Sequence, residues 1–275
     1  MNEKTIAFIG GGNMARSLIG GLIADRHPAA GLRVAEPDAE RREALIADFE
    51  VQAFQENATA VRGADVVILA VKPNRVADVV RELAPQIQAQ GSLVISVAAG
   101  VRCADIDSWL GGDRPVVRAM PNTPALVQTG ATALFANAAV SSEQRDLAET
   151  ILRAVGLIVW LEDERDMNAV TAISGSGPAY FFATMEAMQS AGESLGLDAR
   201  TAHLLTLETA LGAARMALES AEDVDELKRR VTSPGGTTAA AIDELEAGDL
   251  AGAYHRALHA AARRAEELGQ ELGDQ

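Results

Sequence analysis

The chain has 275 residues, 48% of them apolar and 23% charged, which is long enough for one large globular domain or two ordinary ones. Its formal net charge is −15, and Lys228-Arg229-Arg230 is its one three-residue basic run, which argues against a nucleic-acid partner because such binding depends on Lys and Arg contacts to phosphates. No apolar run approaches the roughly 20 residues of a membrane-spanning helix, no signal peptide is predicted, and the single cysteine, Cys103, excludes an internal disulfide, so we expect a cytoplasmic protein.

The first part of the chain alternates short β-branched runs with helical segments. Strands are predicted at residues 5–10, 32–36, 65–71, 92–97, 115–120, 131–136 and 157–161. Nearly continuous apolar strands that alternate with helices are typical of a mostly parallel sheet covered on both faces. We therefore expect an α/β, doubly wound, Rossmann-type domain over residues 1–163.

Strand patterns stop after about residue 163, and the remainder is predicted to be helical. The predicted helices span residues 164–173, 179–195, 199–220, 223–231, 237–247 and 249–271. They are rich in alanine and carry apolar residues on more than one side, which favours a second buried face against another subunit. We therefore expect an all-α domain over residues 164–275 that forms a homodimer, with a compact monomeric bundle as the alternative.

A glycine-rich loop follows the first predicted strand and opens a helix. In IAFIGGGNMA, Gly10, Gly12 and Ala15 match the pattern G-x-G-x-x-G/A, whose glycines permit a tight turn and the close approach of a pyrophosphate. The context predicts dinucleotide binding, and a glycine-rich turn that binds nothing is the alternative. The expected cofactor-binding residues of this loop are Ile9, Gly10, Gly11, Gly12, Asn13, Met14 and Ala15.

Three further loops follow predicted strands: AVKP (70–73), SVAAG (96–100) and MPNTP (120–124). Ligands of open α/β sheets bind beyond the carboxyl ends of the strands, so these loops and the glycine loop would line one cofactor cleft, although each alone could be a plain turn.

The choice between NAD and NADP is left open by the residues around the second predicted strand. Glu36 could accept from the ribose hydroxyls of NAD and would repel the 2′-phosphate of NADP. Arg33, Arg41 and Arg42 are near enough in sequence to bind that phosphate instead. Each of these residues could equally be a solvated surface group.

The residues of familiar dehydrogenase chemistry are missing. No Tyr-x-x-x-Lys pair exists, since the residues four positions after Tyr180 and Tyr254 are Thr and Leu. His255 and His259 have the spacing of a zinc helix but lack a neighbouring Glu and a third ligand, so no metal site is predicted. Reduction of a C=N bond tolerates this lack, because a protonated cyclic imine arrives already activated and needs mainly orientation.

Two motifs stand out in the helical part, SGSGPAYFF (174–182) and VTSPGGTT (231–238). Together with FIGGGNMA, AVKP, SVAAG and RAMPNTP, in this order and at these intervals, they resemble the motifs of the pyrroline-5-carboxylate reductase family over residues 5–270. The resemblance implies a Rossmann-type domain followed by a helical dimerisation domain, with dimers that associate further into a decamer. It also implies reduction of 1-pyrroline-5-carboxylate to L-proline, the last step of proline biosynthesis, with NADPH (NADP) placed first and NADH (NAD) second.

The resemblance also assigns site residues. Ser233, Gly236 and Thr237 would offer N–H groups to the substrate carboxylate, and Thr238 would hydrogen-bond the ring nitrogen as the catalytic residue. The further substrate-side residues that it implies are Gly235, Ser176, Gly177, Glu164 and Arg230. The further cofactor-side residues that it implies are Glu36, Asn57, Ala70, Val71, Lys72, Pro73, Ala98, Ala99 and Asn122.

The SPGGTT segment has two interpretations. Ser and Thr before a helix are common structural caps, and on the residues alone a cap is favoured. A nicotinamide domain, the missing acid–base group and the family motifs instead favour capture of a carboxylate by the unpaired N–H groups at the start of the helix.

Two other functions compete with the proline reaction. A two-domain 3-hydroxy acid or ketopantoate dehydrogenase needs a catalytic lysine from the helical part, where Lys228 is the one lysine. A non-catalytic, dinucleotide-binding redox sensor needs an effector segment, and none is evident in the sequence.

Overall fold

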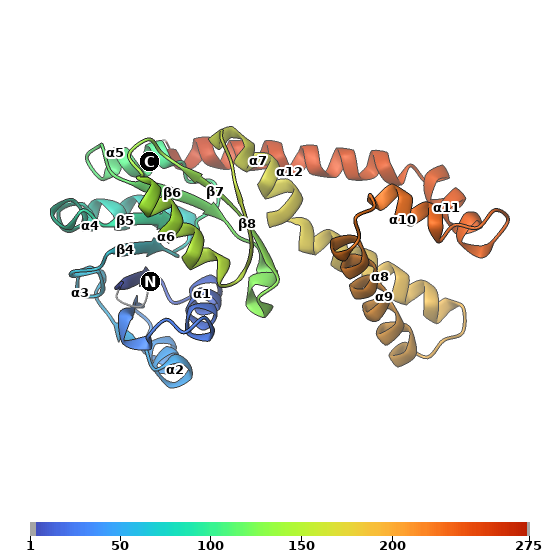
Figure 1. Ribbon diagram of the computed structural model, residues 1–275, viewed down its shortest axis with the longest axis horizontal. Coiled ribbons are helices and arrows are strands. Elements are labelled where there is room, and N and C mark those ends of the chain that lie inside the picture. The colour runs from blue at the N-terminus through green and yellow to red at the C-terminus, as the bar shows by residue number, and fades with distance from the viewer. Residues whose placement is uncertain (1–3, 274–275) are drawn as a thin grey trace. The chain divides into compact units, whose positions relative to one another are not determined.

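The computed structural model describes residues 4–273, which divide into two compact units (Figure 1). Unit 1 comprises the residues up to Ser176 together with those from Ala260 onward, and unit 2 comprises Gly177–His259. The domain bounds 1–163 and 164–275 stay a prediction, and their outer ends, residues 1–3 and 274–275, lie outside the described residues.

Unit 1 is built on an eight-stranded sheet with the order β3-β2-β1-β4-β5-β6-β7-β8. The strands are β1 Ile6–Ile9, β2 Leu32–Ala35, β3 Gln52–Phe54, β4 Val66–Leu69, β5 Leu93–Ser96, β6 Val116–Met120, β7 Gly130–Ala136 and β8 Gly156–Trp160. Every described pair of neighbouring strands is parallel except β6 and β7. All seven predicted strands are confirmed, and the short edge strand β3 is an addition.

Helices cover both faces of this sheet. They are α1 Asn13–Ala24, α2 Ala39–Phe49, α3 Asn57–Val61, α4 Val76–Gln90, α5 Cys103–Trp109 and α6 Ser142–Arg153. Successive residues of a strand point to opposite faces, so β1 sends Ile6 and Phe8 into the core shared with α1 and α6. Ala7 and Ile9 enter the second core, shared with α4 and α5. The predicted doubly wound, mostly parallel fold is confirmed.

Short helical turns follow β8 within unit 1. A 3-10 turn spans Glu164–Asp166, α7 spans Met167–Val170 and a π-helical turn spans Thr171–Gly175. The last turns of α12, Leu250–Gly273, also belong to unit 1, where Leu272 is buried in the core of α4 and α5. The end of α12 therefore returns to the sheet and lies beside α5 (Figure 1).

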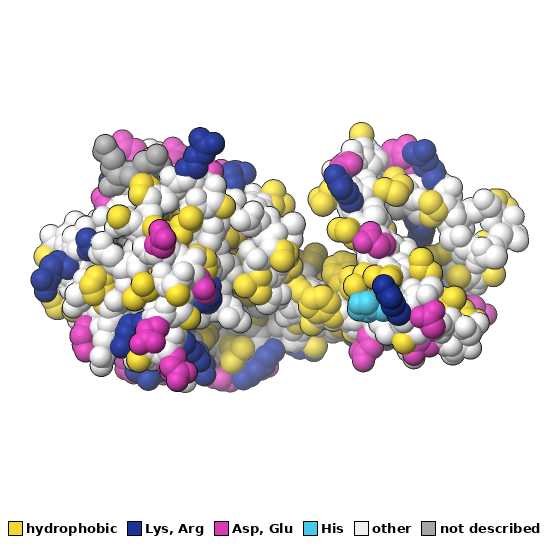
Figure 2. All heavy atoms as spheres, turned by 90° about the horizontal axis from the view of Figure 1, so that it is seen from below, with side chains coloured by type: hydrophobic (Ala, Val, Ile, Leu, Met, Phe, Trp, Pro, Cys, Tyr) yellow, Lys and Arg dark blue, Asp and Glu magenta, His cyan; other side chains and the backbone are white. Residues whose placement is uncertain are grey.

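Unit 2 contains α8 Gly177–Ser194, α9 Ala199–Glu219, α10 Val224–Arg230, α11 Thr237–Ala247 and the first part of α12. The predicted helices of this region are confirmed. Many large apolar side chains of this unit are exposed, among them Phe182 at 64% and Leu218 at 85% on helices and Leu195 at 86% in the turn after α8. Yellow side chains mark this surface in Figure 2. Among residues 4–273, no helix combines the length and the apolar character that crossing a bilayer demands.

Candidate active site

The four loops expected at the cofactor meet at one edge of the sheet. β2 and β3 lie on one side of β1, whereas β4, β5 and β6 lie on the other, so the strand order reverses at β1. The crevice beyond the carboxyl ends of parallel strands at such a point is the usual dinucleotide site. Because β1, β4, β5 and β6 are parallel neighbours, the loops that follow them share that edge.

Gly10 and Gly12 of the glycine loop have different structural needs. Gly10 has φ +99°, and a Cβ there would lie 2.7 Å from the carbonyl oxygen of Ala70, so the loop after β1 packs directly on the loop after β4. A Cβ on Gly12 would meet nothing within 4 Å. Gly12 is the N-cap of α1 and provides no side-chain cap, so the first N–H groups of this helix have no side-chain acceptor there. The open space and these amides fit a pyrophosphate.

Glu36 is buried beside this loop and is only 5% exposed. Its Oε2 accepts from the N–H of Gly11 at 3.0 Å, and its Oε1 accepts from the N–H of Asp38 at 3.1 Å. Arg42 Nη1 donates to the carbonyls of Glu36 and Pro37 at 2.8 and 2.7 Å. The carboxylate therefore connects the loops after β1 and β2, and a guanidinium lies at the end of β2.

The other two arginines considered for a 2′-phosphate form hydrogen bonds with residues other than Glu36. Arg33 Nη1 donates to the carbonyl of Arg62 at 2.5 Å, and the backbone N–H of Arg41 donates to Asp38, the N-cap of α2.

The loops after β3, β4 and β5 present a mixture of backbone and side chains. Asn57 begins α3, and its Nδ2 donates to Glu82 Oε2 at 3.2 Å. Lys72 is exposed at the start of a 3-10 turn that opens with Pro73. Ala98 is buried, with its N–H donating to Ser96 Oγ at 3.3 Å.

 

Ala70, Val71 and Ala99 are half-buried residues of these loops, and together with Ala98 they present small side chains and backbone to this edge of the sheet. Small side chains let a ligand approach the backbone closely, which suits the flat face of a nicotinamide ring.

Asn122, expected at the nicotinamide, uses its amide within the protein. Its Oδ1 accepts from the N–H of Ala131 at 2.9 Å, and its Nδ2 donates to both the carbonyl oxygen and the Oγ of Ser174 at 3.3 Å. Nearby, a Cβ on Gly175 would overlap the Cε of Met120. The structure therefore holds the RAMPNTP loop against the SGSG turn, although the two motifs are 52 residues apart.

The SGSG turn ends at the junction between the two units. Ser176 closes the π-helical turn, and its N–H donates to the carbonyl of Thr171 at 2.9 Å. Gly177 begins α8, so Pro178 stands in the second position of this helix. This position suits a residue without an N–H, because the first N–H groups of a helix have no partner within it.

Glu164 lies within a partly buried network. Its Oε1 accepts from the N–H of Cys103 at 2.8 Å and from Arg118 Nη1 at 2.9 Å, and Arg118 is only 5% exposed. Burial, and after it the nearby Glu164 carboxylate, raises the pKa of the Cys103 thiol far above its ordinary value, so this thiol stays protonated. Sequence reasoning did not single out Arg118, although it is the one charged residue in the apolar strand PVVRAM.

The SPGGTT loop lies in unit 2 and leads into α11. Gly235 has φ +69°, a left-handed conformation that favours glycine, and the N–H of Gly236 donates to the carbonyl of Ser233 at 3.0 Å. Gly236 is the N-cap of α11, and no side chain caps this helix. The structural-cap interpretation is therefore wrong in its simple form, because no Ser or Thr hydroxyl occupies the amides at the start of α11.

The remaining residues of this region are placed as follows. Ser233 and Thr237 are exposed, and Thr238 is half-buried in the first turn of α11. Arg230 ends α10, where its Nη1 pairs with Glu222 Oε2 at 2.5 Å, and this partner raises the pKa of the guanidinium.

Comparison with known proteins decides the family. The model described as pyrroline-5-carboxylate reductase dimerisation matches residues 164–268, and the model described as NADP oxidoreductase coenzyme F420-dependent matches residues 5–100. A pyrroline-5-carboxylate reductase from Pseudomonas aeruginosa is 52% identical over 99% of this chain and 100% of its own. The chain belongs to the pyrroline-5-carboxylate reductase family. This membership confirms the predicted family, enzyme class and reaction, and neither rival function is favoured.

Further pyrroline-5-carboxylate reductases agree in sequence and fold. The enzyme from Vibrio alginolyticus is 41% identical over 98% of both chains. A solved structure of the enzyme from Coxiella burnetii has 48% identity and a TM-score of 0.93, covering 97% of this chain and 99% of its own. The Plasmodium falciparum enzyme, solved with NADP bound, has 28% identity and a TM-score of 0.88, covering 98% of this chain and 99% of its own.

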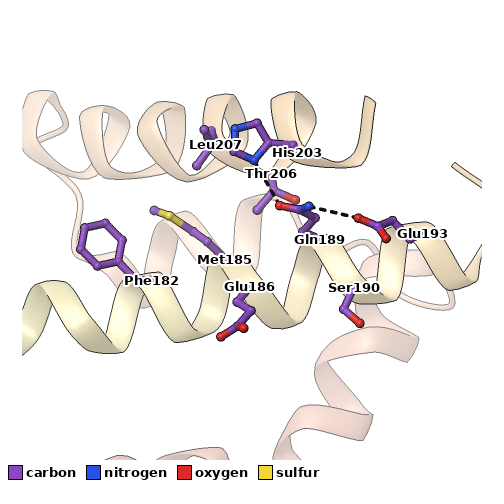
Figure 3. Close-up of a pocket in the computed structure, with 9 residues that line it drawn as sticks. All are labelled: Phe182, Met185, Glu186, Gln189, Ser190, Glu193, His203, Thr206 and Leu207. Carbon is purple, nitrogen blue, oxygen red and sulfur yellow. Dashed lines mark hydrogen bonds between the residues drawn. The ribbon is translucent and has the colours of Figure 1, made fainter. Parts of the chain in front are cut away.

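As a member of this family, the chain carries a dimerisation domain in its helical part. A cavity of about 350 Å³ lies in unit 2 between α8 and α9 (Figure 3). Gln189 lies between His203 and Glu193 there, with its Oε1 3.1 Å from His203 Nδ1 and its Nε2 donating to Glu193 Oε1 at 3.0 Å. The residues that line this cavity include none of those predicted for the active site, so we assign it no part in the reaction.

Proposed function

We propose that the chain reduces 1-pyrroline-5-carboxylate to L-proline with hydride from a nicotinamide dinucleotide, and that the amides at the start of α11 hold the substrate carboxylate. The start of α11 carries this proposal: Gly236 is the N-cap, no side chain caps the helix, and α11 has 11 residues. The free N–H groups and the positive end of the helix dipole suit an anion. The local donors offset the background of a chain with net charge −15.

The dinucleotide would be held by the loops at the carboxyl edge of the sheet. The pyrophosphate would lie on Gly12 and the first turn of α1, where a Cβ would fill open space and the amides lack a side-chain cap. Ala98, Ala99 and Lys72 would contact the nicotinamide nucleotide, and Asn57 the adenosine end. When bound, the cofactor supplies a hydride to the imine carbon of the ring.

The proton balance of the reaction needs little help from the protein. The imine, one hydride and one proton give the secondary amine of proline, and the ring nitrogen can carry its proton into the site. The Thr238 hydroxyl would hydrogen-bond that nitrogen and orient the ring, while Ser176 and Gly177 would wall the pocket. Glu164 and Arg230, which the resemblance also assigns to the substrate, already have protein partners.

We place NADPH before NADH as the cofactor. Arg42 of α2 holds its guanidinium at the end of β2 and can turn it toward a 2′-phosphate, and the Plasmodium falciparum relative was solved with NADP bound. Glu36 argues in the other direction, although both of its oxygens already accept backbone N–H groups. The preference is tested by measuring kcat/KM for NADPH and for NADH over the same series of substrate concentrations and comparing the two values.

We further propose a homodimer that associates into a decamer. The exposed apolar residues of unit 2 and the matched dimerisation model support a subunit interface on these helices. Light scattering coupled to gel filtration tests the assembly, and a monomer at micromolar concentration would contradict it. A cytoplasmic location stays a prediction from the cysteine content.

The reaction is tested with purified protein by following loss of NADPH or NADH absorbance when 1-pyrroline-5-carboxylate is added. Ketopantoate and 3-hydroxy acids, each with the appropriate cofactor redox state, are the controls. Turnover of the imine acid alone supports the proposal. Turnover of the control substrates alone rejects it, and tight dinucleotide binding without any turnover favours the redox sensor.

A further inference from the structure

The Glu164 carboxylate joins two loops of the cofactor edge. Its bond to the N–H of Cys103 holds the first residue of α5, which comes directly after the 97–102 loop. Its bond to Arg118 holds the middle of β6, which leads into the loop that carries Asn122. One carboxylate oxygen therefore serves both segments, at 2.8 and 2.9 Å.

The network of Glu164, Cys103 and Arg118 is partly buried. The side chain of Arg118 is 6% exposed, whereas that of Glu164 is 21% exposed and lines a cavity, so Arg118 is the buried member of this ion pair. Arg102, the N-cap of α5, makes no side-chain cap, so Glu164 supplies the acceptor at the start of this helix from 61 residues away. Breaking the pair would leave the Arg118 charge buried without a counter-charge.

The 97–102 loop is also enclosed on its other side by the end of α12. A Cβ on Gly100, whose φ is +82°, would lie 3.2 Å from Leu272 Cδ1, and a Cβ on Gly269 would lie 3.1 Å from the carbonyl oxygen of Gly100. Arg118 and Glu164 line a cavity together with Gly100 and Gly269. The loop is thus packed on α12 along one side and anchored at its end by Glu164.

We propose that Glu164 is a positioning residue, which sets the 97–102 and 121–123 loops for hydride transfer by anchoring Cys103 and Arg118, and is not a ligand of the substrate. The proposal rests on the proposed function, since it takes these loops as the nicotinamide side of the site. Hydride transfer depends on the distance between the reacting atoms, and a displacement of about 1 Å can lower the rate about 100-fold. Loosening both loops should therefore reduce kcat.

The test uses Glu164→Gln, which keeps the length and one oxygen of the side chain but removes the charge that Arg118 requires. Glu162→Gln is the matched control, because Glu162 is exposed and lies two residues away. The double variant Arg118→Met/Glu164→Gln removes both charges and leaves no buried cation, so it keeps the test valid if the single variant folds poorly.

Two measurements decide the proposal. Hydrogen exchange of the dinucleotide-free protein should become faster at residues 97–104 and 119–123 in both Glu164 variants, and stay unchanged at the glycine loop and in the control. Activity should show kcat lowered at least about tenfold, with KM for 1-pyrroline-5-carboxylate within about threefold of the parent.

Other outcomes overturn the proposal. A large rise in KM with unchanged exchange would make Glu164 a substrate ligand. Faster exchange over the whole of unit 1, with kcat per folded enzyme unchanged, would make the ion pair a general stabiliser. If the parent protein fails to reduce 1-pyrroline-5-carboxylate, the proposed function fails, and the exchange data together with the dinucleotide dissociation constant still report whether Glu164 anchors the two loops.

Discussion

The variant Gly12→Ala should leave the stability of the fold nearly unchanged but weaken the binding of a dinucleotide. Gly12 has φ −72° and ψ −174°, which any residue can adopt, and an added Cβ would meet nothing within 4 Å. Alanine is a poorer N-cap than glycine, which lowers stability. Alanine also makes the unfolded chain less flexible, which raises stability by about 0.4–1 kcal/mol. These effects oppose each other, so we expect the free energy of unfolding to change by less than about 1 kcal/mol.

Dinucleotide binding should respond differently. If a pyrophosphate approaches the backbone at Gly12, the added methyl group displaces it from the amides of α1. Loss of one hydrogen bond to a charged oxygen costs about 1.5–3 kcal/mol, which weakens binding by about 10- to 150-fold. Titration of NADPH fluorescence gives the dissociation constant, and calorimetric unfolding gives the stability.

Gly10→Ala is the matched control for this experiment. A Cβ at Gly10 would lie 2.7 Å from the carbonyl oxygen of Ala70, in a backbone conformation with φ +99°. The left-handed conformation and the overlap with a backbone atom should lower stability by about 2–4 kcal/mol. A dissociation constant for Gly12→Ala within twofold of the parent would refute the placement of the pyrophosphate.

Three further predictions concern the substrate loop, the loop connection and pH. Thr238→Ala should lower kcat about tenfold and leave the dinucleotide dissociation constant near that of the parent. The unfolding temperature should also stay near that of the parent, because Gly236 and not Thr238 is the N-cap. A loss of stability with kcat intact would instead give Thr238 a structural role. Asn122→Leu should lower the free energy of unfolding by about 1–3 kcal/mol, measured by urea titration, because the N–H of Ala131 loses its acceptor; an unchanged midpoint would contradict this. Burial lowers the pKa of His27, so the folded protein binds this proton less readily than the unfolded chain, and stability that is present above about pH 6.5 should fall as the pH decreases below it. Between pH 8 and pH 5, the free energy of unfolding measured by urea titration should therefore change less with pH in His27→Gln than in the parent. An equal change in both proteins would exclude His27 as the source.

The periodicity of the sequence was sufficient to predict most of the fold. Seven strands were predicted within one or two residues, because β-branched runs between glycine- and proline-rich turns are clear patterns. β3 was missed because Gln52–Phe54 is three residues long and not fully buried, so it shows no alternation. The return of α12 to unit 1 was also not predicted, since helical periodicity does not say which body a helix contacts.

The candidate site was predicted less completely. Motif spacing identified the loops, but not the partners of Glu36, Asn122 and Glu164, which lie 25, 52 and 46 residues away along the chain. These contacts arise from tertiary packing, and no local pattern records them. Arg118 left one trace in the sequence, because a lone charge within an apolar strand needs a buried partner.

The account depends most on the amides at the start of α11. The most direct measurement is a crystal structure of the protein soaked with L-proline. We expect the proline carboxylate within hydrogen-bonding distance of the N–H groups of Ser233 and Thr237, because the N–H of Gly236 already donates to the Ser233 carbonyl, with Thr238 Oγ1 at the ring nitrogen. Well-ordered proline elsewhere, with the 233–238 loop unoccupied, would contradict the central claim.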